Sequence, residues 1–169
     1  MEKILKSVES IRKITDFAPQ IALVLGSGLG KFVENVDVVC SIDYKDIDGF
    51  EKTSIVGHRG KMVFGYVEKV PVVIMQGRYH YYEGFPMKDV VMPIRVMRLL
   101  GAEILILTNS AGGISDAFKP GSLMLIRGHI STFVPSPLIG ENIEKLGPRF
   151  PDMSDVYDRQ LQNAIRAAA

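Results

Sequence analysis

The chain has 169 residues, the usual length of a single domain with a sizeable core. Hydrophobic residues make up 47% of it and charged residues 23%, which is ordinary globular composition and excludes a disordered or fibrous protein. The 20 basic and 19 acidic residues nearly cancel and form no block of like charge, so nothing indicates a nucleic-acid partner. Cys40 is the single cysteine, which excludes an intrachain disulfide framework, and no apolar run is long enough to cross a membrane. We therefore expect a cytoplasmic protein with one domain over 1–169.

Hydrophobic periodicity predicts helices that alternate with buried strands, the pattern of an α/β domain. The expected elements are a helix with an apolar face from Ile4 to Ile14, strands at Ile21–Leu25 and Val36–Ile42, a hairpin of Lys61–Val67 and Val70–Met75, a helix capped by Asp89 and running to Leu100, a buried strand at Glu103–Thr108, a strand at Ser122–Arg127, a long loop over Ser131–Phe150 and a helix over Tyr157–Ala169.

Three of the expected strands run into loops with chemically useful residues. These loops are Gly26–Gly30, Gln76–Gly84 and Asn109–Gly113. In α/β sheets ligands bind beyond the carboxyl ends of the strands. The three loops are therefore expected to converge on one site.

The loop Gln76–Gly84 is the most informative stretch of the chain. Arg78, His80 and Glu83 lie within six residues, interleaved with tyrosines. An arginine matches the geometry of phosphate or carboxylate, and a histidine donates to an anion or moves a proton near pH 7. The alternative is a surface loop with solvated charges, and the convergence of three loops favours an anion site over it.

The glycine-rich loop Gly26–Gly30 fits neither familiar nucleotide motif. Lys31 stands where a dinucleotide fingerprint needs its third glycine, which weakens a nicotinamide-dependent oxidoreductase. A Walker loop would need glycine in place of Leu25 and Ser or Thr in place of Phe32. A strand followed by a turn with backbone N–H groups and the Ser27 hydroxyl remains, and such a turn can cradle phosphate.

The histidines His58, His80 and His129 have no metal-ligand spacing, so no metal site is expected. Ser27 lacks the G-x-S-x-G elbow, which makes a serine hydrolase a weak interpretation. For His129 we favour an ordinary core or loop role.

Five short motifs occur in order along nearly the whole chain. They are GSGLG at Gly26–Gly30, GHRG at Gly57–Gly60, GRYHYYEG at Gly77–Gly84, TNSAGG at Thr108–Gly113 and GPRFPDMSD at Gly147–Asp155. Together they resemble the purine nucleoside phosphorylases, and more narrowly the trimeric, low-molecular-mass class that acts on inosine and guanosine. The related methylthioadenosine phosphorylases share the architecture, but the YYEG ending of the third motif favours the nucleoside phosphorylases.

The resemblance implies an α/β, three-layer domain with a central mixed β-sheet, a homotrimer, and the reversible phosphorolysis of purine nucleosides. Inorganic phosphate is then a co-substrate and no cofactor is needed. The resemblance also assigns residues. It implies a phosphate site of Ser27, His58, Arg78, His80 and the backbone N–H of Ser110, a ribose and base pocket with Tyr82, Asn109, Ala111 and Gly112, and catalytic roles for His80 and Asn109.

The chain departs from the family pattern at three positions and at its end. Gly128 and Ser131 flank the His-Ile pair where the family commonly has Asp and Asn, and Leu146 replaces a frequent aromatic. Family members continue beyond the equivalent of Ala169, with the base-recognising Glu and Asn, a phosphate-binding Ser, and a sugar-binding His and Met. We therefore expect an incomplete domain, and the alternative function is a non-catalytic remnant that folds and binds phosphate or a sugar phosphate.

Overall fold

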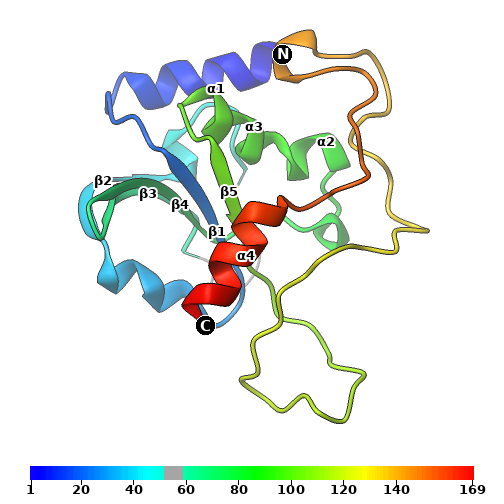
Figure 1. Cartoon of the computed structure of the whole chain (residues 1–169). Helices are drawn as coiled ribbons and strands as arrows, with labels where there is room; N and C mark the ends of the chain where they lie inside the picture. Colours follow the sequence, from blue (N-terminus) through cyan, green and yellow to red (C-terminus); the bar gives the residue numbers. More distant parts are fainter. Residues whose placement is uncertain (52–58) are drawn as a thin grey trace. The chain divides into compact units, whose positions relative to one another are not determined.

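The computed structural model describes residues 1–51 and 59–169, and Figure 1 shows the course of the chain. The chain divides into two compact units, Met1–Ser110 and Ala111–Ala169. One domain over 1–169 stays a prediction. His58, which the sequence places in the phosphate site, lies outside the described residues.

The first unit is built on a mixed, five-stranded sheet (Figure 1), with strand order β2-β3-β4-β1-β5. Strand β1 is parallel to both β4 and β5, and β3 is antiparallel to both β2 and β4. The predicted α/β class with a mixed sheet is confirmed. The strands are β1 (Ile21–Leu25), β2 (Asp37–Asp43), β3 (Lys61–Val67), β4 (Val70–Gln76) and β5 (Ile104–Leu107).

The predicted hairpin is confirmed, with β3 and β4 joined at Glu68 and Lys69. Their φ angles are 48° and 71°. Positive φ at both central residues is the geometry of a type I′ turn, whose twist matches that of the flanking strands. Val67 pairs with Val70 directly across the turn, so the two-residue loop sets the register of the hairpin.

Two helices pack together in the first unit. Helix α1 (Glu2–Arg12) packs against α3 (Met92–Leu99), and α3 also contacts β1. Arg12 links the two helices through its guanidinium, which donates to the carbonyl of Leu100 at 2.8 Å. In residues 1–51 and 59–169, no helix combines the length and the apolar character needed to cross a bilayer.

The prediction that Asp89 caps one helix running to Leu100 is wrong. Asp89 lies inside the short helix α2 (Met87–Val90), and α3 begins two residues later. Pro93 in the first turn of α3 has no N–H to donate to the carbonyl of Asp89, and its ring crowds that carbonyl, so α2 ends at Val90 and a new helix begins at Met92. The Asp89 carboxylate instead pairs with Lys3 Nζ of α1 at 2.8 Å.

A cluster of buried apolar residues lies between the sheet and the 3₁₀ helix η1 (Gly30–Asn35). Phe32 and Val33 of η1 pack against it, directly after the glycine-rich loop. Burial of these side chains therefore anchors both ends of that loop, one by β1 and the other by η1. The buried members are Leu25, Val36, Val63, Val72 and Ile74.

Strand β5 forms as predicted but is not buried. Leu105, Ile106 and Leu107 are 40%, 40% and 51% exposed. The reason is its position, because β5 is the last strand in the order and pairs with β1 among the described strands. An apolar run indicates that a strand is suited to burial but not that a second layer covers it.

The second unit has little regular structure. Residues Ser122–Arg127 form no strand, which corrects the prediction. Between Ser131 and Phe150 the chain is a long loop with one 3₁₀ turn, η4 (Glu144–Leu146). The expected C-terminal helix is confirmed as α4 (Arg159–Ala168), where the Asp158 side chain accepts a hydrogen bond from the N–H of Leu161 at 2.8 Å.

Candidate functional site

The parallel strands β1, β4 and β5 end side by side. Leu25 at the end of β1 pairs with Gln76 at the end of β4, and Val24 pairs with Leu107 at the end of β5. The three loops that follow therefore start at one edge of the sheet. The predicted convergence is confirmed for the parts of the loops that lie within Met1–Ser110.

Arg78 belongs to the loop after β4, and its side chain reaches the residue that follows β5. Its Nη1 donates to the carbonyl oxygen of Thr108 at 2.5 Å, and its Nε donates to His80 Nε2 at 3.2 Å. The guanidinium is half-buried. These two bonds orient its planar fork of donors, which is the geometry that binds phosphate oxygens in pairs.

His80 is held by Glu83, three residues along the chain. Glu83 Oε1 lies 2.7 Å from His80 Nδ1 and also accepts the backbone N–H of His80 at 3.0 Å. The Glu83 side chain is only 3% exposed and that of His80 13%. A carboxylate accepts and does not donate, so Nδ1 carries the proton and Nε2 accepts from Arg78. The imidazole is thereby fixed in one tautomer, with Nε2 on the Arg78 side.

Sequence reasoning noticed Glu83 in this loop but gave it no role. The spacing His-x-x-Glu was the available signal. In the 3₁₀ turn η3 (Tyr81–Glu83) the side chains at i and i+3 lie over one another, and Gly84, with φ of 90°, ends the turn. Glu83 therefore belongs with Arg78 and His80 in the candidate site.

The glycine-rich loop is tied to the end of β5. The N–H of Gly26 donates to Thr108 Oγ1 at 2.8 Å. A Cβ at Gly26 would lie 2.6 Å from the carbonyl oxygen of Thr108, so the close approach of the two backbones requires glycine here. The N–H of Leu29 is also used inside the turn, as a donor to the Gly26 carbonyl at 3.2 Å.

An aromatic cluster supports the Gly77–Gly84 loop from the protein interior. Tyr44 donates to the carbonyl of Gly77 at 2.6 Å, directly before Arg78. Tyr79, directly after Arg78, donates to the Glu51 carbonyl at 2.9 Å and accepts the Glu51 N–H at 2.8 Å. Burial raises the pKa of Tyr44 and of Tyr79 above the ordinary range for tyrosine, so both hydroxyls stay neutral donors.

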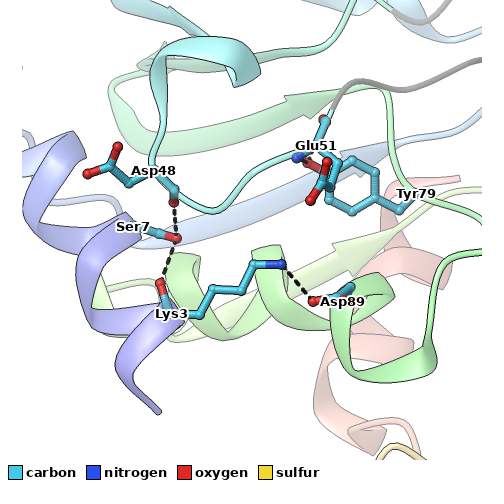
Figure 2. A network of polar contacts seen from close by, with 6 residues as sticks. All are labelled: Lys3, Ser7, Asp48, Glu51, Tyr79 and Asp89. Atoms are coloured by element: carbon cyan, nitrogen blue, oxygen red, sulfur yellow. Dashed lines mark hydrogen bonds and ion pairs between the residues drawn. The ribbon is translucent and has the colours of Figure 1, made fainter.

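The segment that ends at Glu51 is held at a second point. Figure 2 shows Ser7 of α1 donating to the carbonyl of Asp48, at 2.6 Å, together with the Lys3–Asp89 ion pair and the two bonds between Tyr79 and Glu51. Helix α1 and the Arg78 loop are thus each linked to this segment by polar contacts, and α2 is linked to α1 by the ion pair. The backbone on both sides of Arg78 is therefore fixed by contacts that a ligand does not need to supply.

The remaining predicted residues of the first unit lie at its surface. Ser27, Asn109 and Ser110 are exposed. Tyr82 is 75% exposed and stacks on the His80 ring, with centroids 4.8 Å apart and planes 24° apart. The structure thus gives Tyr82 a contact with His80, and its expected contact with ribose stays a prediction.

The predicted residues Ala111 and Gly112 begin the second unit and are exposed there. His129, expected to have an ordinary core or loop role, is exposed and its Nε2 lies 2.5 Å from the hydroxyl of Tyr157. This contact joins two segments of the second unit that are far apart in sequence.

The sequence and the fold were compared with known protein families. The profile of the phosphorylase superfamily matches residues 20–169, which include strands β1 to β5 of the described residues and the loops that follow them. The chain belongs to the phosphorylase superfamily. Within this superfamily it is a homologue of the purine nucleoside phosphorylases, which confirms the resemblance drawn from the five motifs.

Two relatives illustrate the similarity of the chain to the purine nucleoside phosphorylases. Over 152 residues the chain is 47% identical to purine nucleoside phosphorylase 1 of Geobacillus stearothermophilus, with 90% of the chain and 56% of that protein covered. A solved structure of isoform 2 of purine nucleoside phosphorylase from Schistosoma mansoni, in complex with cytosine and ribose-1-phosphate, is 42% identical with a TM-score of 0.87. That match covers 96% of this chain and 58% of the Schistosoma chain. The chain thus spans between half and two thirds of the length of these superfamily members.

Proposed function

We propose that the protein is a purine nucleoside phosphorylase, which converts a purine (deoxy)ribonucleoside and phosphate reversibly into the free base and (deoxy)ribose 1-phosphate. The observation that carries the proposal is the linked arrangement of Arg78, His80 and Glu83 at the carboxyl ends of parallel strands. The Schistosoma relative, whose structure holds ribose-1-phosphate, supports a sugar phosphate as the product.

In the proposed reaction phosphate is itself the nucleophile. It attacks the anomeric carbon while the purine leaves, through a transition state with oxocarbenium character. Arg78 binds the phosphate dianion, together with Ser27, His58, His80 and the Ser110 N–H, and places it beside the positive charge that develops on the sugar. Tyr82, Asn109, Ala111 and Gly112 contribute to the ribose and base pocket, and neither a metal nor an organic cofactor takes part.

Glu83 has a positioning role in this mechanism. Its carboxylate holds His80 Nδ1–H, so Nε2 faces Arg78 and the phosphate that Arg78 binds. The same carboxylate also stabilises the imidazolium form of His80, in which Nε2–H donates to an oxygen of the bound phosphate. This hydrogen bond would hold phosphate in place while it attacks the sugar, and it supports the catalytic role that the resemblance implies for His80 together with Asn109.

The proposed enzyme works in the cytoplasm as a homotrimer, with phosphate and purine nucleosides as its partners and with neither nucleic acid nor membrane involved. The trimer rests on the resemblance and on the proline-rich segment Ser131–Phe150, which is suited to lie across a neighbouring subunit. Sedimentation is expected to give a trimer, and a monomer at all concentrations would contradict this part of the proposal.

The test of the activity is phosphate-dependent release of hypoxanthine from inosine, with phosphate binding measured in parallel by calorimetry. The proposal expects both. Phosphate and ribose 1-phosphate binding without hypoxanthine release would favour the second candidate, a non-catalytic remnant. That candidate is kept because the chain spans 56% of the length of its Geobacillus relative. Absence of phosphate binding would overturn both candidates.

A further inference from the structure

Thr108 connects the three loops of the candidate site. It follows β5, its hydroxyl contacts the loop after β1, and its carbonyl contacts Arg78 in the loop after β4. We propose that Thr108 is a positioning residue, which sets the spacing between the glycine-rich loop and Arg78 and so prepares the phosphate site. This inference rests on the proposed function.

The Thr108 side chain continues the pairing between β1 and β5 beyond its last residue pair. Its backbone N–H donates to the carbonyl of Val24 at 3.1 Å. Its Oγ1 donates to the same carbonyl at 2.9 Å and accepts the N–H of Gly26 at 2.8 Å. The hydroxyl thus acts as donor and acceptor at once, which a hydroxyl can do and a methyl group cannot.

The Thr108 carbonyl also accepts a hydrogen bond. It accepts Arg78 Nη1 at 2.5 Å, while the N–H of the same residue is bound to Val24. The residue whose carbonyl orients Arg78 is therefore also held to β1 through its own N–H. A shift of Thr108 would move the guanidinium and the turn before Ser27 together, and bidentate anion binding tolerates little misplacement.

The backbones of Gly26 and Thr108 approach each other closely at this junction. The 2.6 Å between a Cβ built on Gly26 and the Thr108 carbonyl oxygen leaves no room for a side chain. The absence of a side chain at Gly26 permits this approach, and the hydrogen bond from its N–H to the Thr108 hydroxyl holds the two loops together. Neither residue needs to touch phosphate to fix the distance between the groups that do.

The test compares Thr108→Val, which removes the hydroxyl and keeps the shape, with Thr108→Ser, which keeps the hydroxyl. Thr15→Val is the matched control, because Thr15 Oγ1 also accepts a backbone N–H, from Phe17 at 3.2 Å, away from the strand ends. Calorimetry with inorganic phosphate is expected to show about tenfold weaker binding for Thr108→Val and a change within about twofold for the other two proteins. Amide exchange at Gly26 is expected to quicken in Thr108→Val alone.

Four results separate this inference from its rivals. Wild-type affinity in Thr108→Val, or an equal loss in Thr108→Ser, would overturn it. A merely structural effect would lower the folded fraction and leave the dissociation constant of the folded protein unchanged, which would also overturn it. Failure of the wild-type protein to bind phosphate would instead overturn the proposed function, while exchange at Gly26 would still report whether the Thr108 hydroxyl holds the loop.

Discussion

Two neutral acceptors orient Arg78. Its guanidinium donates to the carbonyl oxygen of Thr108 at 2.5 Å and to His80 Nε2 at 3.2 Å, and neither of these two acceptors is a carboxylate. An oriented guanidinium presents a planar fork of charged donors, which is why we expect Arg78 to bind phosphate.

Replacement of Arg78 by Ala is expected to weaken phosphate binding by roughly tenfold to a hundredfold or more, because a charged hydrogen bond contributes about 1.5–3 kcal/mol. Titration calorimetry with inorganic phosphate measures the loss. Arg98→Ala is the matched control, since Arg98 also donates to a backbone carbonyl, that of Ala102, but lies on α3. Unchanged affinity in a folded Arg78→Ala protein would remove the centre of the proposed site.

Glu83→Gln is expected to lower kcat/KM for phosphorolysis by about tenfold or more, because the amide no longer stabilises a charged His80. Steady-state assays at several pH values measure the effect, and the pH dependence of kcat is expected to change as well. Glu144→Gln serves as control, since Glu144 lies on η4 in the second unit. A pH profile identical to that of the wild type would show that Glu83 only supports the loop.

Among the elements, the β3–β4 hairpin combines strong pairing with an unfavourable turn. Glu68 and Lys69 both adopt positive φ although neither is Gly, Asn or Asp. Left-handed geometry costs a residue with a Cβ roughly 1–2 kcal/mol. The antiparallel pairing of β3 with β4 offsets that cost, so the two-residue connection is preserved at some expense in stability.

Lys69→Gly is therefore expected to raise the free energy of unfolding by about 0.5–1 kcal/mol, since the strain it relieves exceeds the extra chain entropy of glycine. Urea denaturation followed by circular dichroism measures the change. Lys69→Ala, which removes the charge and keeps the Cβ, is expected to leave stability nearly unchanged. Equal stabilisation by both variants would show that the charge of Lys69, and not its backbone geometry, is responsible.

At the scale of the whole molecule, the expected activity depends on how much of its relatives' length the chain covers. The loop that holds Arg78 and His80 lies within Met1–Ser110. The base-recognising residues that the resemblance implies follow the equivalent of Ala169. Phosphate binding and purine binding are thus expected to depend on different parts of the family's sequence.

The 169-residue chain alone is accordingly expected to bind phosphate but to turn over inosine about 10²–10⁴ times more slowly than an enzyme with help for the departing base. Steady-state inosine phosphorolysis by the purified chain, with its mass confirmed, is the measurement. Turnover within the typical range of about 1–10³ per second would show that the purine site lies within these residues. The same assay is repeated after the C-terminal part of a relative has been added in trans, and the two turnover rates are compared.

Local sequence determined most of the first unit. Apolar runs and turn residues predicted β1, the hairpin and the carboxyl-end loops, because buried strands and tight turns are specified by neighbouring residues. The sequence also predicted an anion site with Arg78 and His80, which stays a prediction, and the five motifs identified the family. The helix break before Pro93 was missed, although the proline itself was the available signal.

Only the tertiary structure decided the contacts between segments distant in sequence. The bonds from Thr108 to Gly26 and to Arg78 span 82 and 30 residues, and no periodicity reports such pairs. The exposure of β5 was equally unpredictable, because the sequence pattern of an apolar strand is the same whether or not a further layer covers the strand. Residue type and local pattern thus predicted which groups could bind an anion, and the parallel pairing of β1 with β4 and β5 decided which of the loops that carry them start side by side.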